Sequence, residues 1–167
     1  MAIGEIHPGR TTDGWRIRRS TSTDVPSIAS LFDEYRQTFG YSSERNAALT
    51  YIRECVAGGE VVVFTAGDAS RPLDLLGFAV LYPAFSSLSM HRTWHLQDLY
   101  VVPKARRRGI ARSLIEHTVK FAKLNSSEHI TLLFPTGNPA LSNLFISFGF
   151  EPYPYEQDQL RYRLKFS

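Results

Sequence analysis

The spacing of apolar residues changes along the chain, and each change predicts a different kind of element. A short strand is predicted over residues 15–19, WRIRR. Apolar residues then recur at helical spacing within STDVPSIASLFDEYRQTF, at Ile28, Leu31, Phe32, Tyr35 and Phe39. The segment YSSERNAALTYIRECVAGG repeats this spacing, so a second helix is expected from a cap at Ser42 or Ser43 to a stop at Gly58 or Gly59.

Beyond Gly59 the pattern becomes that of strands. EVVVFTA and LLGFAVLYP flank the turn-forming GDASRPLD, which predicts a hairpin, and TWHLQDLYVV before Pro103 predicts a third strand. The chain then alternates: a helix over residues 110–123, a strand at HITLLF, a helix at NPALSNLFISFG, and strands over residues 150–155 and at LRYRLKF. A strand–helix–strand unit of this length implies a parallel pair with a right-handed crossover.

Together these elements predict one α/β domain over residues 1–167. We expect a mixed central sheet of about six to seven strands flanked by about four helices, antiparallel in its first half and with a parallel pair around the turn after Pro103. Residues 1–13 are expected to be a loosely ordered N-terminal extension. A hydrophobic content of 43% supplies enough apolar side chains for one core.

Charge is concentrated in the segment VVPKARRRGIARSLIEH. The formal net charge is +3, from 19 Lys and Arg against 16 Asp and Glu. Without the five basic residues of this segment the balance is 14 against 16, a net charge of −2. The basic character is therefore local, which favours one focused anionic partner over a cationic surface spread across the protein.

Cysteine content and hydropathy indicate the compartment. Cys55 is the only cysteine, and it lies at an apolar helical position, so core packing is favoured over a nucleophilic role. The longest apolar run, residues 75–85, contains Gly77 and Pro83 and is shorter than the roughly 18 residues that a membrane span needs. A cytoplasmic protein with no membrane partner is expected.

The basic segment itself has the layout of a phosphate site. A strand, a turn and a helix follow one another, and the first turn of a helix presents unpaired backbone N–H groups at the positive end of the helix dipole. Gly109 and Ala111 are small enough to let a ligand approach that backbone, and the arginines add charge. On these grounds alone the signal is moderate, because no dinucleotide or Walker motif is present.

Two motifs resemble those of the GCN5-related N-acetyltransferase (GNAT) superfamily. Arg106-x-x-Gly109-x-Ala111 after LYVVP is similar to the family's Arg/Gln-x-x-Gly-x-Gly/Ala signature. NPALSNLFISFGF is similar to its Asn-x-x-Ala-x-x-Leu-Tyr-x-x-x-Gly-Phe, and four positions match: Asn138, Leu144, Gly149 and Phe150. The likeness covers about residues 15–166, and DEYRQTFGYSS looks most like the small-amine, polyamine or histone-type branch.

The resemblance implies the GNAT fold, acetyl-CoA as acetyl donor, and a set of residues that hold it. These are Leu99, Tyr100, Val101, Arg106, Arg107, Arg108, Gly109, Ile110, Ala111, Arg112, Asn138 and Phe145. For the strand residues, core packing is an equally plain role, and both can hold because the implied contacts are through main chain. For Asn138 the alternative is a helix N-cap.

The implied reaction is direct attack of a primary amine, of a small molecule or a peptide, on the acetyl thioester. Asp98 is the candidate general base, since apolar neighbours would raise its pKa, and the alternative is a structural carboxylate. Gln97 cannot act as a base. The family's proton-donating Tyr corresponds to Phe145, which leaves Tyr100, Tyr153 or a water for that role.

The resemblance also places Glu34 and Glu44 in the region that lines the acceptor site, although most helical carboxylates are solvated. Tyr35 and Tyr41 are at least partly core by their spacing, and rings near the helix junction could also line an amine pocket through cation–π contact. The histidines do not form a metal site, because His91 and His95 are four apart in a strand.

Rival functions follow from the same residues. A catalytically weak acyl-CoA-binding or regulatory domain is the alternative suggested by Phe145. Specific nucleic-acid binding is disfavoured, because no aromatic stacking platform accompanies the basic turn. A homodimer would use exposed strand edges near residues 160–166.

Overall fold

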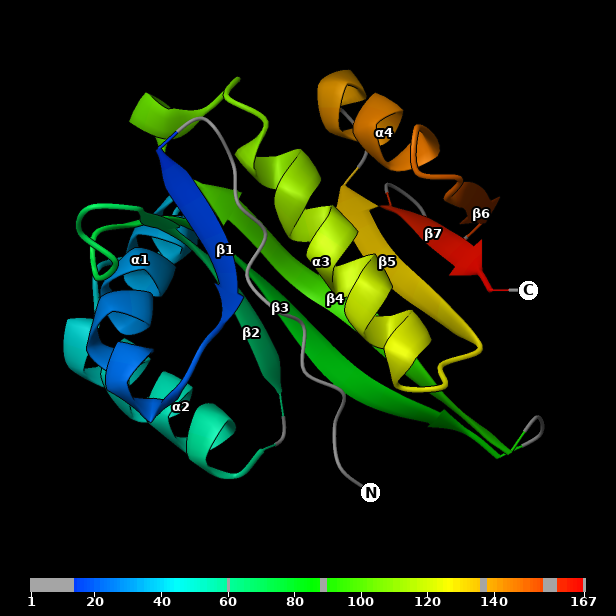
Figure 1. Cartoon of the computed structure of the whole chain (residues 1–167), viewed down its shortest axis with the longest axis horizontal. Coiled ribbons are helices and arrows are strands. Elements are labelled where there is room, and N and C mark those ends of the chain that lie inside the picture. The colour runs from blue at the N-terminus through cyan, green and yellow to red at the C-terminus, as the bar shows by residue number, and fades with distance from the viewer. Residues whose placement is uncertain (1–13, 60, 88–89, 136–137, 155–158, 167) are drawn as a thin grey trace.

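The protein, studied as a computed structural model, is described over residues 14–166 except 60, 88–89, 136–137 and 155–158, so the expected extension over residues 1–13 lies outside the described residues (Figure 1). The helices are α1 (Val25–Gln37), α2 (Arg45–Ala57), α3 (Ile110–Leu124) and α4 (Pro139–Ile146). The strands are β1 (Trp15–Arg19), β2 (Val62–Asp68), β3 (Leu75–Ser86), β4 (His91–Val101), β5 (His129–Pro135), β6 (Glu151–Pro154) and β7 (Gln159–Lys165). Every predicted element is present.

A seven-stranded sheet in the order β1-β2-β3-β4-β5-β7-β6 forms the centre of the fold. The pair β4–β5 is parallel and the other neighbours are antiparallel, as the sequence predicts. The strand edge expected near residues 160–166 is partly covered, because residues 160–163 of β7 pair with β6 as well as with β5. Leu164 and Lys165 pair with β5 alone in the described ladder, and the expected homodimer stays a prediction.

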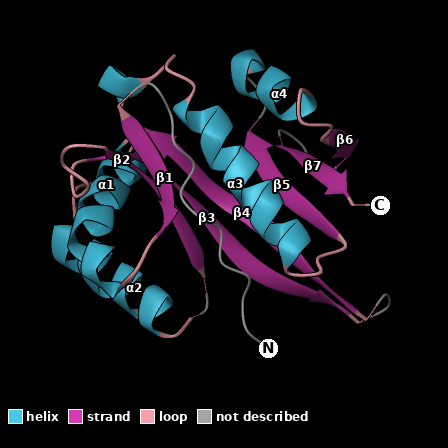
Figure 2. Ribbon diagram, viewed as in Figure 1, coloured by secondary structure: helices cyan, strands magenta, loops and turns pink. Residues whose placement is uncertain are grey.

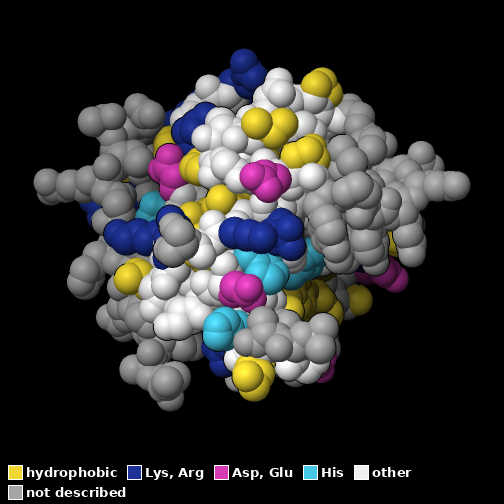
Figure 3. Space-filling model, turned by 90° about the vertical axis from the view of Figure 1, so that its right-hand side faces the viewer, with side chains coloured by type: hydrophobic (Ala, Val, Ile, Leu, Met, Phe, Trp, Pro, Cys, Tyr) yellow, Lys and Arg dark blue, Asp and Glu magenta, His cyan; other side chains and the backbone are white. Residues whose placement is uncertain are grey.

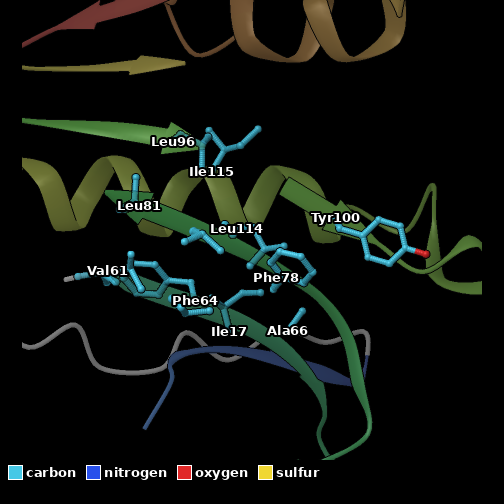
Figure 4. Packing of buried hydrophobic residues seen from close by; sticks show 14 of the residues in the cluster. Ile17, Val61, Phe64, Ala66, Phe78, Leu81, Leu96, Tyr100, Leu114 and Ile115 are labelled. Carbon is cyan, nitrogen blue, oxygen red and sulfur yellow. The ribbon is translucent and has the colours of Figure 1, made fainter. Parts of the chain in front are cut away.

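Helices cover both faces of the sheet. Figure 2 shows α3 and α4 on one face and α1 and α2 on the other, next to β1–β4. On the α3 face, Phe121 packs edge-on against Phe64 of β2, with ring centroids 5.7 Å apart. On the α1 face, Tyr35 packs edge-on against Phe78 of β3 at 5.6 Å. Figure 4 shows the apolar side chains of β2–β4 meeting α3 in the first of these cores.

Local hydrogen bonds set the starts of α1 and α2. Asp24, which is 1% exposed, accepts hydrogen bonds from Arg18 of β1 and from the backbone N–H of Thr21, so β1 and the start of α1 are tied together. The cap expected at Ser42 or Ser43 lies at Glu44 instead, because the Ser43 hydroxyl donates to Asp33 at 2.6 Å. Ser43 thus hydrogen-bonds to the buried Asp33 of α1 and does not cap α2.

A bulge divides β4 into two halves. Val80 of β3 pairs with Asp98 and its neighbour Leu81 pairs with Leu96, so Gln97 is one residue in excess. An extra residue shifts the alternation of side chains between the two faces. Leu96 consequently lies beside Ile115 of α3 (Figure 4), whereas Asp98 meets Tyr35 of α1 on the other face. Within the described residues, no helix is long and apolar enough to cross a membrane.

Candidate active site

A cleft opens where β4 and β5 separate. Their pairing covers Trp94–Leu96 opposite Ile130–Leu132, while Gln97–Val101 continue beside β3 alone in the described ladder. The resulting cleft has a volume of about 780 Å³ and lies between the end of α1, the split strands, the start of α3 and α4. An opening at the carboxyl ends of a parallel pair is a common position for a ligand in α/β sheets.

The turn between β4 and α3 supplies the polar end of this cleft. Arg107 has a φ of 62° and Gly109 a φ of 81°, so two of the three residues before α3 have a left-handed φ. This turn brings Arg106, Arg107 and Gly109 to the lining of the cleft. Because α3 begins at Ile110, its unpaired N–H groups and dipole add to the same end.

Two arginines at this turn are held by protein contacts. Arg106 donates from Nε to the carbonyl of Val101 at 3.0 Å, which folds it back along the strand end. Arg112 donates to the hydroxyl of Ser147 at 3.3 Å, and its guanidinium lies 5.2 Å from the ring centroid of Phe148. Arg112 therefore links α3 to the end of α4 across the cleft mouth.

The predicted cofactor residues gather around this one cleft, with one exception. All of them line it except Arg108. Arg108 instead lines a second cavity of about 520 Å³, between α1 and the β2–β3 turn, together with Glu34 and Lys104. Asn138 is the N-cap of α4, since its side chain accepts a hydrogen bond from the N–H of Leu141 at 3.2 Å, and it also lines the cleft.

Sequence reasoning missed the apolar wall of the cleft and the bulge. The missed lining residues are Thr38, Phe39, Leu96, Gln97, Ala105, Leu132, Ala140, Leu141 and Leu144. Most of these positions have the spacing of core residues, so no signal in one sequence separates a ligand wall from a core. Gln97 cannot act as a base, but it is the extra residue of β4. Because the register of the ladder shifts there, Asp98 faces α1 while Leu96 faces α3.

Asp98 lies beside the bulge and is half-buried. Its neighbours Gln97 and Leu99 line the cleft, whereas Asp98 is not among the lining residues. Burial raises its pKa above the usual range, while a hydrogen bond from the Tyr35 side chain opposes part of that rise. Burial, and then the charge of Asp98 and the hydrogen bond to it, raises the pKa of Tyr35 as well. Tyr35 therefore remains protonated and donates to the carboxylate. A carboxyl group with a raised pKa beside a cleft has the properties of a general base.

Phe145 has no proton to donate and lies within the core. It is 2% exposed, with its ring 5.6 Å from Phe150 and 6.0 Å from Tyr162 of β7, and it contributes an apolar part of the cleft wall. Among the described lining residues, the hydroxyl groups are those of Tyr35, Thr38 and Tyr100. The side chain of Tyr153 lies outside the described residues.

The predicted acceptor residues are not all brought together. Tyr35 lines the cleft, whereas Glu34 lines the second cavity. Tyr41 is 62% exposed, and the guanidinium of Arg36 lies 5.3 Å from its ring centroid.

The other chemically active side chains have structural surroundings. His95 Nδ1 lies 2.9 Å from the hydroxyl of Thr131 on β5, and Cys55 is a buried free thiol. In the described part of the chain, no three His, Cys, Asp or Glu residues are grouped so that they could hold a metal ion.

Comparison with known proteins identifies the fold and family. The model of the acetyltransferase (GNAT) family matches residues 28–150. The chain is 32% identical over 135 residues to YhfO of Bacillus subtilis (strain 168), an uncharacterized N-acetyltransferase, covering 81% of this chain and 89% of that protein.

Solved structures agree with this. A crystal structure of a probable acetyltransferase is similar with a TM-score of 0.77 and 30% identity, covering 85% of this chain and 91% of that one. Arabidopsis thaliana NAA60 in complex with acetyl-CoA has the same fold, with a TM-score of 0.70 and 21% identity over 89% of this chain and 96% of that one. The split sheet, the arginine-rich turn and these matches have one explanation: the chain belongs to the acetyltransferase (GNAT) family and is an N-acetyltransferase.

Proposed function

We propose that the protein transfers the acetyl group of acetyl-CoA to a primary amine by direct attack, with Asp98 as general base. The observation that carries the proposal is the position of this half-buried carboxyl group, which lies between Gln97 and Leu99 of the cleft wall, on the strand that leads into the turn before α3. The strand supplies the base, and the turn at its end supplies the anion site.

The cleft fits acetyl-CoA in its chemistry. The first turn of α3 offers its unpaired N–H groups, together with Arg107 and Arg112, for a pyrophosphate. The split between β4 and β5 exposes backbone of residues 97–101 to an amide-containing arm, and Leu132, Leu141 and Leu144 line the apolar remainder. Bound there, acetyl-CoA would supply the thioester carbonyl that the amine attacks.

The reaction requires that the acceptor's ammonium group lose one proton. A free alkylamine has a pKa near ~10.4, so producing its neutral form at pH 7 costs about 4.6 kcal/mol. Asp98 accepts that proton, and its raised pKa makes it a better acceptor than an ordinary carboxylate. Tyr35 holds the carboxylate in place through its hydroxyl.

The leaving thiolate needs no proton from Phe145. A thiol pKa of about 8.5 makes it a tolerable leaving group, and the hydroxyls of Tyr35 and Tyr100 line the same cleft. Tyr100 is 7% exposed, and burial raises its pKa, so it stays protonated and able to donate.

The deciding experiment is thiol release from acetyl-CoA with a panel of primary amines. Asp98→Asn is expected to reduce kcat/KM by about 10²-fold or more while acetyl-CoA binding is kept, because the base is lost and the anion site is untouched. Asp74→Asn, at an exposed ion pair with Arg71, is the matched control and should leave kcat/KM unchanged.

The second candidate function is an acyl-CoA-binding or regulatory domain with weak catalysis, which the apolar Phe145 favours. Binding of CoA without thiol release for any amine would establish it, and failure to bind CoA would overturn both candidates.

A further inference from the structure

Aromatic side chains form a continuous row on the α1 and α2 face of the sheet. The hydroxyls of Tyr82 on β3 and Tyr51 on α2 are 2.7 Å apart. The ring of Tyr51 stacks on Phe32 with centroids 5.6 Å apart, and Phe32 lies 6.1 Å from Tyr35. Tyr35 in turn meets Phe39 edge-on at 5.1 Å. We call these five residues the aromatic row.

The row ends at the cleft and is open to solvent. Tyr35 and Phe39 line the cleft, so this end of the row lies where the acetyl group would be presented, and the other three rings extend the row away from the cleft lining. Phe39 is 58% exposed and Tyr51 is 42% exposed, which is unusual for rings that also pack against other rings. Partly exposed aromatic rings beside a reactive centre are typical of a site that receives an apolar body.

A single carboxylate serves this row. Asp98 hydrogen-bonds Tyr35 and acts electrostatically on both Tyr51 and Tyr82. Two further acids lie on α1 near its end. Asp33 accepts hydrogen bonds from the hydroxyl of Ser43 and the N–H of Glu44. Glu34 lines the second cavity together with Lys104 and Arg108.

The carboxylate of Glu44 likewise accepts from Arg36 at 3.1 Å, and Arg36 adds a positive charge there. Asp98 can therefore pair with one ammonium group of an acceptor. A second ammonium group would lie near Arg36 and near the carboxylates of Asp33 and Glu44, which already accept hydrogen bonds.

From this arrangement we infer that the aromatic row is the acceptor subsite, and that it selects a primary amine with a single positive charge and an apolar, preferably aromatic, body. This rests on the proposed acetyl transfer at Asp98. The ammonium group would lie over the rings near Asp98, where cation–π attraction favours it before deprotonation. The Tyr51–Tyr82 pair fixes the far end of the row and sets how long a body it accepts.

Matched amines test the selection directly. With saturating acetyl-CoA, kcat/KM for 2-phenylethylamine should exceed that for n-propylamine by about ten-fold or more, because burial of a ring adds apolar contact. 1,4-Diaminobutane should be no better than n-butylamine. If 1,4-diaminobutane or spermidine has a higher kcat/KM than 2-phenylethylamine and n-butylamine, the acceptor inference is overturned and acetyl transfer is left in place.

Variants locate the subsite. Tyr51→Ala should reduce the ratio of kcat/KM between 2-phenylethylamine and n-propylamine by about three-fold or more, since part of the ring contact is lost. Tyr51→Phe keeps the ring and should retain most of that ratio. Phe85→Ala removes a 74%-exposed ring on the β3–β4 hairpin and is the control. A ratio unchanged in Tyr51→Ala would overturn the assignment.

Binding separates this inference from the proposed reaction. Calorimetric titration of each amine into the complex with CoA measures occupancy without turnover. If 2-phenylethylamine binds more tightly than 1,4-diaminobutane but no amine is acetylated, the subsite stands and the proposed reaction fails. If neither binding nor turnover favours the aromatic amine, the subsite is overturned.

Discussion

Asp98 costs the folded protein stability at neutral pH, because burial raises its pKa above the unfolded value. A group with a raised native pKa binds more protons in the folded state than in the unfolded state across the interval between the two pKa values. The free energy of unfolding therefore falls as pH rises from about 3.9 through the native pKa of Asp98. The raised pKa that makes Asp98 a better proton acceptor therefore also lowers the stability of the folded protein at neutral pH.

Asp98→Asn should accordingly raise the melting temperature at pH 7 relative to the native protein, and the difference should shrink as pH falls toward about 4, where the native carboxyl is protonated. Asparagine can still accept a hydrogen bond from Tyr35. Thermal unfolding at several pH values measures this, and a melting temperature lowered equally at every pH would contradict it.

Tyr35→Phe should shift the acidic limb of the pH profile of kcat/KM to higher pH. The hydroxyl donates to Asp98 and lowers the pKa of that carboxyl, so its removal lets burial raise the pKa further. The ring contacts with Phe78 and Phe39 remain. A loss of rate with no movement of the acidic limb would show that Tyr35 acts on the substrate instead.

At the scale of elements, the turn before α3 shows how far a sequence can be interpreted. Its composition and its place between a strand and a helix predict an anion site, and the structure brings residues of this turn to the lining of the cleft. The bulge in β4 is not predictable, because Gln97 fits an ordinary strand alternation. The Tyr51–Tyr82 contact is equally hidden, since it joins residues 31 apart that pair only after the sheet has formed.

Gly109→Ala should lower the free energy of unfolding by about 1 kcal/mol, since an alanine at positive φ is strained. It should also raise KM for acetyl-CoA, because the added methyl group meets no protein atom within 4 Å and would point into the space of the turn. Gly59→Ala, at a φ of 64° and equally open, is the matched control. It should lose similar stability with KM unchanged.

At the scale of the whole molecule, one short segment accounts for the excess of positive charge. Figure 3 shows another side of the protein, on which basic, acidic and histidine side chains are interspersed. Without Lys104, Arg106, Arg107, Arg108 and Arg112 the formal balance is 14 against 16, so this one segment accounts for the positive excess. Of these, Arg106, Arg107 and Arg112 line the cleft. Such a local field steers one anionic ligand.

Added salt should therefore act on one substrate more than on the other. KM for acetyl-CoA is expected to rise several-fold between ~0.05 and ~0.5 M sodium chloride, since screening shortens the reach of the exposed arginines. KM for 2-phenylethylamine, which carries no charge beyond its amine, should change less. Salt screens a partly buried carboxylate such as Asp98 less than it screens an exposed arginine. Steady-state kinetics at three salt concentrations would check this, and equal rises in both KM values would contradict it.

The single extra residue in β4 has a consequence for how such a sequence can change. Because the two halves of the strand follow opposite parity, Trp94 and Leu96 build the α3 core while Asp98 and Tyr100 face α1. Substitutions on one half leave the other undisturbed. Deletion of Gln97 would make the pairs Leu81–Leu96 and Val80–Asp98 consecutive in a regular ladder, so Leu96 would still face α3 and Asp98 would still face α1. Regular pairing that kept Gln97 would instead turn Asp98 toward α3 and Leu99 toward α1. The register of the ladder, rather than the side chain of Gln97, is thus what keeps the acid on the α1 face.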